Sequence, residues 1–504
     1  MSRNALLVYP KFPTSYWGMQ YSIEFIGKKA SMPSLSLLTI AGMFPDSYNL
    51  KIVDMNVEPL RDSHLKWADI VFTSTMIVQK DSLNDVIRRC NNAGIPIIAG
   101  GPHPTSFHED IYGVDYLVMG EVEESFDELL QTMSMEDFSG KGNFNYSHLK
   151  PDITKTPVPR YDLVKFANYE SMSLQFSRGC PFNCEFCDIT KLYGRNPRTK
   201  SNKQMLAEFQ MLYDLGWRGP VFLVDDNFIG NRRDTMRLLP DLVKWQKERN
   251  YPFDLYTEAS VNLANYDDML ALMVESNFFM VFLGIETPDY NALVTTKKTQ
   301  NVKKNEDDFL MKAVRKIQGH GIQVSAGFIL GLDGDSENAF ENQIAFIQEA
   351  GIPLAMVGLL GALKGTDLYQ RLLNEGRLIH ETDGNNVGLQ LNFIPEMDTT
   401  KLLEGYKHVL GTIYDKKLKN YFDRCLNMFD AMGDYRSRVR IGKAEMMAMW
   451  KSFTRQIFSP QGPAYIQFMS RVMKKYPRLL PDAVRLAIIG YHCSKITHDL
   501  ILKG

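Results

Sequence analysis

Residues 178–187 read Arg178-Gly179-Cys180-Pro181-Phe182-Asn183-Cys184-Glu185-Phe186-Cys187, and this stretch indicates the fold of the 504-residue chain. Its cysteines have the spacing C-x3-C-x2-C. Three thiolates this close together can bind three irons of a cubane 4Fe-4S cluster. No fourth cysteine follows at a ligand spacing, so one iron is left without a protein ligand and is open to a substrate.

The alternative interpretation is a structural zinc site, or three unrelated thiols. Zinc favours a fourth soft ligand at a usual spacing, and the other cysteines, Cys90, Cys425 and Cys493, are remote in sequence. The surroundings of the motif, described below, favour the iron–sulfur cluster.

The three cysteines, with an aromatic residue, Phe186, before the last one, resemble the signature of the radical S-adenosylmethionine superfamily. In that family the methionine amine and carboxylate of S-adenosylmethionine chelate the fourth iron. An electron from the cluster then splits the sulfonium and releases a 5′-deoxyadenosyl radical, which abstracts hydrogen from an unactivated carbon. The resemblance therefore implies S-adenosylmethionine as cosubstrate and a 4Fe-4S cluster bound by Cys180, Cys184 and Cys187.

Length and composition indicate a multidomain globular protein of the reducing cytoplasm. At about 100–200 residues per domain, the chain has room for about three domains. Hydrophobic residues make up 44% and charged residues 23%, and the net charge of −2 gives no general attraction to nucleic acid. Six cysteines, three of them in one motif, do not form a disulfide framework, and the longest apolar run, residues 354–363, is about half a membrane span. We expect domains at 1–145, 166–370 and 371–504, with a linker at 146–165.

The first 145 residues alternate β-rich runs with helical patterns, which predicts an α/β domain with a doubly wound parallel sheet. The helix predicted over Ser82–Asn92 has one apolar face that includes Cys90, so Cys90 is predicted to be a core residue. The predicted strands are Ala5–Tyr9, Leu50–Asp54, Ile70–Ser74, Ile95–Ala99 and Tyr116–Met119.

Small or polar residues follow three of these strands, where such a sheet binds its ligand. They are Ser74-Thr75, Gly100-Gly101-Pro102-His103 and Gly120-Glu121. Each alone is explained by a tight turn, although glycines there also let a bulky ligand approach the backbone. Together they resemble the cobalamin-binding domain that precedes the radical domain in one large subfamily, which implies cobalamin as a further cofactor.

One departure from that domain concerns the ligand of cobalt. Cobalamin domains that ligate cobalt use Asp-x-His-x-x-Gly, and the nearest match, Asp62-Ser63-His64, lacks the glycine and lies in a helical stretch. Many radical members also lack that histidine. We therefore still expect cobalamin, without a protein imidazole on its lower face.

Beyond a polar, proline-bearing linker at 143–162, strands and helices alternate again. Six strands with helices between them match the partial (β/α)6 barrel that the resemblance implies. The predicted strands are Met172–Phe176, Val221–Val224, Phe253–Glu258, Met280–Ile285, Gln323–Leu330 and Ala355–Leu360.

Active residues of such barrels lie just beyond the carboxyl ends of the strands. This rule selects Asp225, Asp226, Asn227, Glu258, Glu286, Gly327 and Gly331 as cofactor-binding candidates. By resemblance, the turn after the second strand contacts the methionine amine, the glutamate after the fourth strand holds the methionine or ribose, and the glycine-rich fifth strand leaves space for adenine. A cationic amine and a ribose diol both favour carboxylates.

Structural roles compete with several of these assignments. Asp225 or Asp226 would be a helix cap before Arg232, and Glu286 would form a salt bridge at the barrel rim. The arginines at 195 and 198 would either meet a carboxylate or phosphate, or lie in a solvated basic loop.

The last region, 371–504, shows helices without strands, beginning with a helix predicted over Lys401–Tyr414. Between Arg436 and Arg485 basic residues outnumber acidic ones. Such a lobe suits peripheral contact with an anionic membrane, or it is a solvated helical cap over the barrel mouth.

The segment Asn392–Asp398, Gly405-Tyr406 and the block 195–233 together resemble the branch of radical enzymes that contains the hopanoid C-2 methylases. The resemblance implies cobalamin-dependent methylation of an unactivated carbon in an apolar small-molecule or lipid substrate, with an electron donor such as flavodoxin or ferredoxin. The alternative is a radical cyclase or carbon–carbon coupling enzyme of the same architecture.

Overall fold

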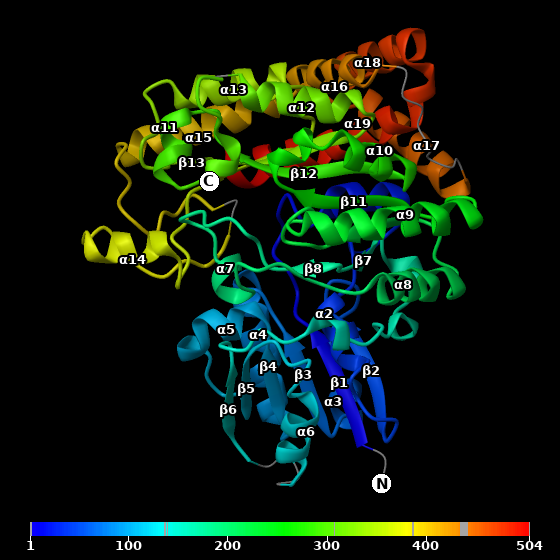
Figure 1. Ribbon diagram of the computed structural model, residues 1–504, viewed down its shortest axis with the longest axis vertical. Coiled ribbons are helices and arrows are strands. Elements are labelled where there is room, and N and C mark those ends of the chain that lie inside the picture. The colour runs from blue at the N-terminus through cyan, green and yellow to red at the C-terminus, as the bar shows by residue number, and fades with distance from the viewer. Residues whose placement is uncertain are drawn as a thin grey trace.

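The computed structural model describes residues 3–135, 138, 140–306, 308–385, 388–433 and 442–502. It consists of two six-stranded parallel sheets with their helices, followed by a helical C-terminal region (Figure 1). The first sheet lies at the bottom of Figure 1, near the N-terminus, and the second lies above it. The α/β fold class expected from the sequence is confirmed.

The first sheet has the strand order β2-β1-β3-β4-β5-β6, and helices cover both of its faces. Successive residues of β1 serve opposite faces: Leu6 packs with the helices α3 (Asp62–Trp67) and α4 (Lys80–Ala93), and Leu7 with α2 (Leu35–Ala41) and α6 (Phe126–Met135). Cys90 of α4 is fully buried in this core, as predicted. The strands are β1 (Arg3–Tyr9), β2 (Tyr48–Asp54), β3 (Ile70–Ser74), β4 (Ile97–Gly100), β5 (Tyr116–Gly120) and β6 (Gly142–Tyr146).

Strand β6 corrects the prediction that a linker begins at residue 143. Gly142–Tyr146 pairs in parallel with Tyr116–Gly120 of β5 and forms the edge of the sheet. Its side chains alternate between partly buried and exposed positions, with asparagines at 143 and 145 exposed. An edge strand without an apolar run gives too weak a pattern to be recognised in the sequence.

The second sheet runs β14-β13-β12-β11-β10-β7, so its six strands are neighbours in chain order, as the partial barrel predicted. The strands are β7 (Met172–Leu174), β10 (Pro220–Leu223), β11 (Asp254–Ala259), β12 (Phe278–Glu286), β13 (Gln323–Leu330) and β14 (Ala355–Leu359). The main outer helices are α8 (Asn202–Asp214), α9 (Arg232–Glu248), α10 (Asp267–Glu275), α12 (Phe309–Gly319) and α13 (Ala339–Glu349).

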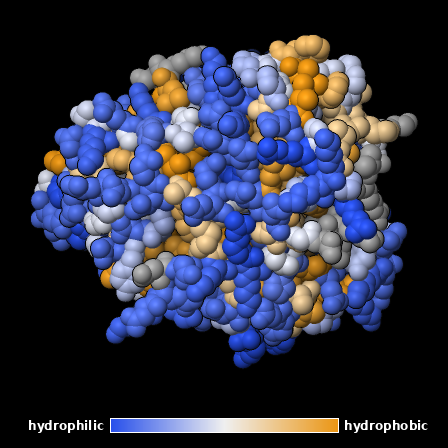
Figure 2. Space-filling model, turned by 90° about the horizontal axis from the view of Figure 1, so that it is seen from above, coloured by the Kyte–Doolittle hydropathy of each residue, from blue (hydrophilic) through white to orange (hydrophobic). Residues whose placement is uncertain are grey.

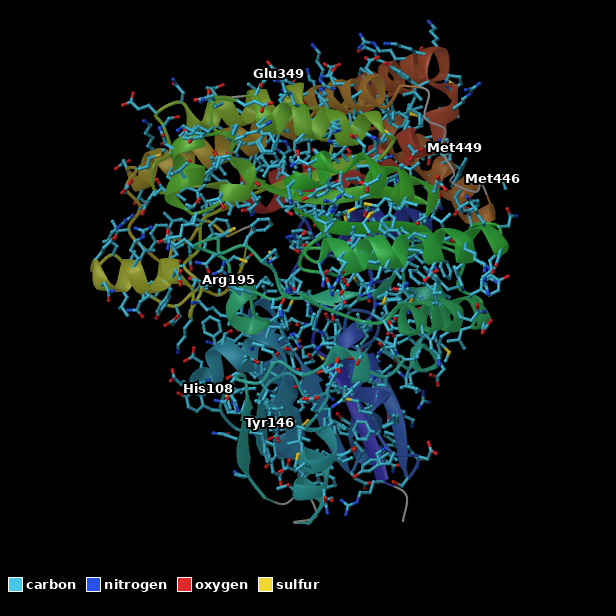
Figure 3. The ribbon with its side chains drawn as sticks, in the orientation of Figure 1. His108, Tyr146, Arg195, Glu349, Met446 and Met449 are labelled. Atoms are coloured by element: carbon cyan, nitrogen blue, oxygen red, sulfur yellow. The ribbon has the colours of Figure 1, made fainter. Side chains whose placement is uncertain are left out.

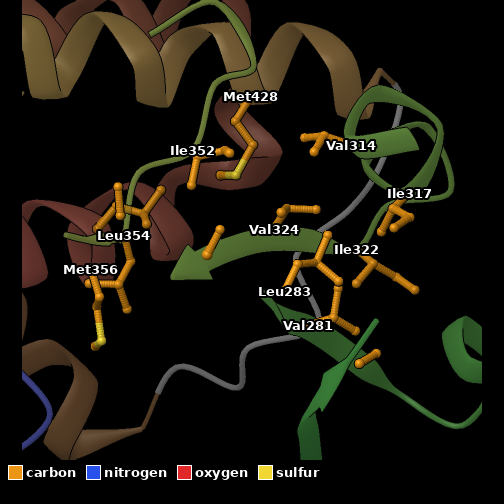
Figure 4. Close-up of a cluster of buried hydrophobic side chains, with 14 of the residues drawn as sticks. Val281, Leu283, Val314, Ile317, Ile322, Val324, Ile352, Leu354, Met356 and Met428 are labelled. Atoms are coloured by element: carbon orange, nitrogen blue, oxygen red, sulfur yellow. The ribbon is translucent and has the colours of Figure 1, made fainter. Parts of the chain in front are cut away.

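Apolar side chains fasten the outer helices to the second sheet. Val281 and Leu283 of β12 and Val324 of β13 are fully buried together with Val314 and Ile317 of α12 (Figure 4). Burial of each such side chain contributes about 1.5–3 kcal/mol, and this packing holds the strand ends, and the side chains that follow them, in place.

Helix α19 of the C-terminal region lies at the amino ends of the barrel strands, whereas α14 packs at their carboxyl side, where Arg371 pairs with Glu185 of the cysteine motif. Asp482, near the start of α19, accepts a 2.8 Å hydrogen bond from the amide of Gln323, the first residue of β13. The predicted cap over the barrel mouth is therefore wrong for this helix, which lies at the opposite end. The helices of this region are α14 (Asp367–Asn374), α15 (Thr399–Ile413), α16 (Lys419–Met432), α17 (Lys443–Ile457), α18 (Gly462–Lys475) and α19 (Leu480–Ile496).

The basic residues at 436, 438 and 440 lie outside the described residues. Over the described residues, no helix has both the length and the apolar character needed to cross a bilayer.

Candidate functional site

The carboxyl ends of the two sheets face each other, with the cysteine loop (residues 178–187) between them (Figure 1). Arg178, the first residue of the loop, pairs with Glu121 at 2.7 Å and with Glu123 at 2.5 Å, and both carboxylates follow β5 of the first sheet. Arg198 also pairs with Glu121, at 2.7 Å, so it is not part of a solvated basic loop. The end of the first sheet that is predicted to bind cobalamin and the end of the second sheet that is predicted to bind the cluster therefore meet at one interface.

The thiols of the cysteine loop are partly buried and face amide donors. Asn227 Nδ2 lies 3.9 Å from Cys180 Sγ, and Gln300 Nε2 lies 3.4 Å from Cys184 Sγ. Burial raises the pKa of Cys180, and that of Cys187 to about 12, so these thiols need a cation to ionise at neutral pH. Such a donor set, with amides directed at the sulfurs, fits an iron–sulfur cluster.

The same thiols do not form a ready site for a single ion. Across the described parts of the chain, no three His, Cys, Asp or Glu side chains converge closely enough to hold one metal ion. A cubane is larger than one ion, so its thiolate ligands lie farther apart than the ligands of zinc.

The aspartates after β10 anchor the start of the cysteine loop. Asp225 accepts hydrogen bonds from the backbone N–H groups of Phe176 at 2.7 Å and Ser177 at 3.0 Å, and Asp226 accepts one from Gly179 at 2.8 Å. The helix-cap alternative is wrong, because the side chain that caps α9 is Asn231. Asp225 therefore holds the turn before the first cysteine.

Four carboxyl groups gather at this end of the barrel, and Glu258 is the one available to a ligand. Burial, followed by repulsion from neighbouring carboxylates, raises the pKa of Asp225 to about 7, of Asp226 to about 6 and of Glu258 to about 8. No described residue hydrogen-bonds the carboxyl of Glu258, which lines a cavity. A cationic ligand placed here would favour its ionised form.

The fourth carboxyl group, Glu286, forms the ion pair that the sequence left as an alternative. Lys298 Nζ lies 2.5 Å from Glu286 Oε1 in a largely buried setting. Burial opposes the charge of Lys298, but Glu286, then Cys184, raise its pKa above the usual range. Sequence reasoning missed Lys298 and Gln300, since no spacing rule connects their loop with the cysteines.

Gly327 of β13 and Gly331, directly after its end, differ in what surrounds them. A Cβ on Gly327 would lie 3.4 Å from Phe282 and 4.0 Å from Glu286 Oε2, inside the barrel. Gly331 has φ +86°, and a Cβ there would lie 2.8 Å from Leu402. The space expected for adenine at Gly331 is therefore filled by Leu402, whereas Gly327 remains beside the carboxyl groups.

At the end of the first sheet, close packing explains two of the predicted glycines. Gly101 and Gly120 have positive φ, and a Cβ would lie 2.7 Å from Ser74 Oγ at the first and 2.5 Å from the Tyr146 backbone at the second. The carboxylate of the third predicted residue, Glu121, forms ion pairs with Arg178 and Arg198.

Two other side chains at this end remain unpaired. Thr75 Oγ1 and both ring nitrogens of His103 are buried without a hydrogen-bond partner among the described residues. They lie beside Gly100 and Pro102, at the strand ends where a doubly wound sheet binds its ligand. Orphaned polar atoms in this position fit a large polar ligand such as cobalamin.

A cavity of about 690 Å³ lies inside the partial barrel that the second sheet forms. Glu258 marks its end at the carboxyl side of the strands, and aromatic and aliphatic side chains from β10, β11, β12 and β14 form much of its wall. A cavity of this size and apolar character accepts a small organic molecule.

Comparison with known families divides the chain into three matched segments. Residues 29–130 match the B12 binding domain, 174–347 the Radical SAM superfamily, and 366–503 a domain of unknown function (DUF4070).

Two relatives are similar over most of the chain. An uncharacterized methyltransferase from Synechocystis sp. is 42% identical, over 85% of this chain and 79% of its own. The hopanoid C-2 methylase of Rhodopseudomonas palustris is 38% identical, over 75% of this chain and 72% of its own.

The solved structures with a similar fold include two cobalamin enzymes. OxsB, a cobalamin-dependent S-adenosylmethionine radical enzyme with aqua-cobalamin and S-adenosylmethionine bound, has a TM-score of 0.63 at 14% identity, over 99% of this chain and 80% of its own. The radical S-adenosylmethionine methyltransferase TsrM from Kitasatospora setae has a TM-score of 0.58 at 12% identity, over 94% of this chain and 99% of its own. At these identities the comparison shows the fold alone.

Proposed function

Because this chain belongs to the cobalamin-dependent radical S-adenosylmethionine methyltransferases, we propose that it methylates an unactivated carbon of an apolar, hopanoid-like lipid. The observation that carries the proposal is the largely apolar cavity that ends at Glu258, close to Asp225 and Asp226, which hold the start of the cysteine loop. The similarity to the hopanoid C-2 methylase supports a substrate of that shape.

In this proposal each cofactor is held by residues already described. Cys180, Cys184 and Cys187 bind the 4Fe-4S cluster, Glu258 and Asn227 bind S-adenosylmethionine with Asp226, Glu286 and Gly327 close by, and Thr75 and His103 contact cobalamin. When bound, the cluster supplies the electron that cleaves S-adenosylmethionine, and cobalamin carries the methyl group. The protein aligns these groups where the sheet ends meet and keeps water out of the apolar cavity.

Product analysis tests the proposed reaction. The reduced enzyme, given a hopanoid hydrocarbon, S-adenosylmethionine and a reductant, is expected to form methylated lipid together with both S-adenosylhomocysteine and 5′-deoxyadenosine, as measured by mass spectrometry. Formation of 5′-deoxyadenosine with an altered lipid but without S-adenosylhomocysteine would instead indicate a cyclase or coupling enzyme. A flavodoxin or ferredoxin is the proposed natural reductant.

Replacement of Glu258 by glutamine is expected to weaken S-adenosylmethionine binding about tenfold, because the amide cannot form a charge-assisted hydrogen bond to a cationic ligand. Equilibrium dialysis with the anaerobic protein measures this. The matched control is Glu275→Gln on α10, where the carboxylate is half-exposed and pairs with Lys247. Equal affinity in the two variants would remove Glu258 from the cosubstrate site.

We also propose that α17 lets the protein contact an anionic membrane peripherally. Trp450 is 62% exposed and Phe453 57%, and Met446 and Met449 lie on the same helix at the edge of the molecule (Figure 3). Figure 2 shows hydrophobic patches within the largely hydrophilic surface of the helical region. Exposed apolar residues on an amphipathic helix with basic neighbours suit an interfacial position.

The double variant Trp450→Ser/Phe453→Ser is expected to reduce binding to anionic vesicles at least about tenfold, because two aromatic side chains no longer enter the interface. Flotation with phosphatidylglycerol vesicles at low salt measures the bound fraction. The control is Tyr112→Ser, which removes a 78% exposed aromatic residue from the first domain. Unchanged flotation of the double variant would exclude α17 as the membrane contact.

A further inference from the structure

The geometry points to a lipid-binding site that runs through the barrel and is loaded from its base, the end formed by the amino ends of the second-sheet strands. We propose that the cavity holds the apolar body of the substrate, with a neutral hydroxylated end group at the base and the reacting carbons near Glu258. This inference rests on the proposed function for the reaction that the enzyme carries out. The shape of the substrate and its path of entry are inferred from the cavity itself.

Between Asp254 at the base and Glu258 at the carboxyl end of β11, the wall of the cavity is largely aromatic and aliphatic. Phe222 of β10 stacks on Tyr256 of β11, with 4.7 Å between the ring centres. Phe282 of β12 packs against Trp17, with 5.0 Å between the ring centres. Asp254, Tyr256 and Glu258 line the same side of β11, as the alternation of a strand requires. This stretch alone spans about 13 Å at about 3.3 Å per residue, so the site suits an elongated ligand.

The lining continues from the strands to the helices at the base. Ala448 and Met449 of α17 and Val484 of α19 belong to it, with the loop 216–219 before β10. Met449 is 44% exposed, so the lining reaches the surface here. The exposed aromatic residues proposed to enter a membrane lie on the same helix, within five residues of Ala448. A lipid leaving the bilayer beside α17 would thus meet the opening directly.

Charged groups of both signs line the base of the cavity: Lys28, Arg218 and Arg485 are cationic, and Glu170, Asp254 and Glu445 are anionic. Glu170 lies in the field of Arg485 and Lys28, and burial raises the pKa of its carboxyl. Lys28 Nζ donates to two backbone carbonyls, at residues 166 and 167, and Arg485 pairs with Asp482. No described residue hydrogen-bonds the carboxyl of Glu170.

These charges offset one another, so the base favours a neutral polar group over an ion. A hydroxyl can donate to the Glu170 carboxyl and accept from a cation, which satisfies both. The substrate class that fits the whole cavity is therefore a long, rigid or chain-like hydrocarbon that ends in hydroxyl groups.

Binding of dehydroergosterol, a fluorescent sterol alcohol, tests the site without any cofactor or turnover. Trp17 and Trp217 line the cavity, so a sterol inside it should quench their emission saturably. In the full-length protein, Val484→Phe narrows the base and is expected to weaken binding at least about tenfold. The matched control, Met447→Phe on the exposed side of α17, should bind as the wild type does.

A second variant keeps the test valid if Val484→Phe is destabilised. Glu170→Ala should reduce the preference for the free sterol over its acetate ester about fivefold, the effect of one net hydrogen bond, while binding of the ester stays unchanged. Wild-type affinity in a folded Val484→Phe variant, or the same loss in Met447→Phe, would overturn the site. Methylation without sterol binding in the cavity would refute this inference alone, whereas sterol binding without methylation would refute the proposed reaction alone.

Discussion

Replacement of Cys184 by alanine is expected to abolish the iron–sulfur absorbance and the cleavage of S-adenosylmethionine together. Two thiolates remain in the loop, and the other cysteines cannot substitute, because Cys90, Cys425 and Cys493 are buried in helices away from it. The side chain of Gln300, 3.4 Å from Cys184 Sγ, offers no thiolate in its place. Iron content and absorbance of the anaerobically reconstituted protein measure the cluster, and 5′-deoxyadenosine measures the cleavage.

The matched control for this variant is Cys90→Ala. That side chain is fully buried in α4 of the first sheet, so its loss costs some stability but leaves the cysteine loop intact. The control should therefore keep both iron and activity. A Cys184→Ala protein that retained iron and still cleaved S-adenosylmethionine would refute the assignment of the ligands.

Replacement of Arg178 by methionine is expected to destabilise the protein by about 3–5 kcal/mol and to release cobalamin. The guanidinium is 13% exposed, and the carboxylates of Glu121 and Glu123 are 6% and 4% exposed. Without Arg178, Glu123 loses its ion-pair partner among the described residues, while Glu121 keeps Arg198. Since this contact joins the ends of both sheets, its loss should loosen the interface where cobalamin and S-adenosylmethionine meet. Denaturant unfolding and corrinoid retention after gel filtration measure the two effects.

Neutralising the carboxylates provides the control for Arg178. In the triple variant Arg178→Met/Glu121→Gln/Glu123→Gln, no uncompensated charge is buried at this contact, and most of the lost stability should return. If the Arg178→Met protein were as stable as the wild type and retained corrinoid normally, the contact would not couple the two sheets.

The sequence was sufficient for the parts of the fold that rest on local patterns. Buried strands such as β3, in which all five residues are buried, give apolar runs that alternate with helical periods, so both parallel sheets were predictable. Strand β6 was missed because an edge strand needs no such run. The end of the barrel that α19 covers depends on long-range contacts, such as Gln323 with Asp482 and Arg485 with Phe279, which no local pattern encodes.

The candidate site was predictable in position but not in contacts. The strand-end rule located Asp225 and Glu286, yet their partners, the N–H groups of Phe176 and Ser177 and the ammonium of Lys298, lie 49, 48 and 12 residues away in sequence. Glu121 was expected to face cobalamin and instead pairs with two arginines. Such pairings are decided by how the two sheets dock, which single-sequence patterns do not report.

The most direct test of the central claim is the fate of S-adenosylmethionine on the anaerobically purified protein reduced with dithionite. We expect iron and sulfide bound at the cysteine loop, and conversion of S-adenosylmethionine to 5′-deoxyadenosine in proportion to that iron. Zinc in place of iron, or S-adenosylmethionine left intact by the reduced protein, would contradict the claim.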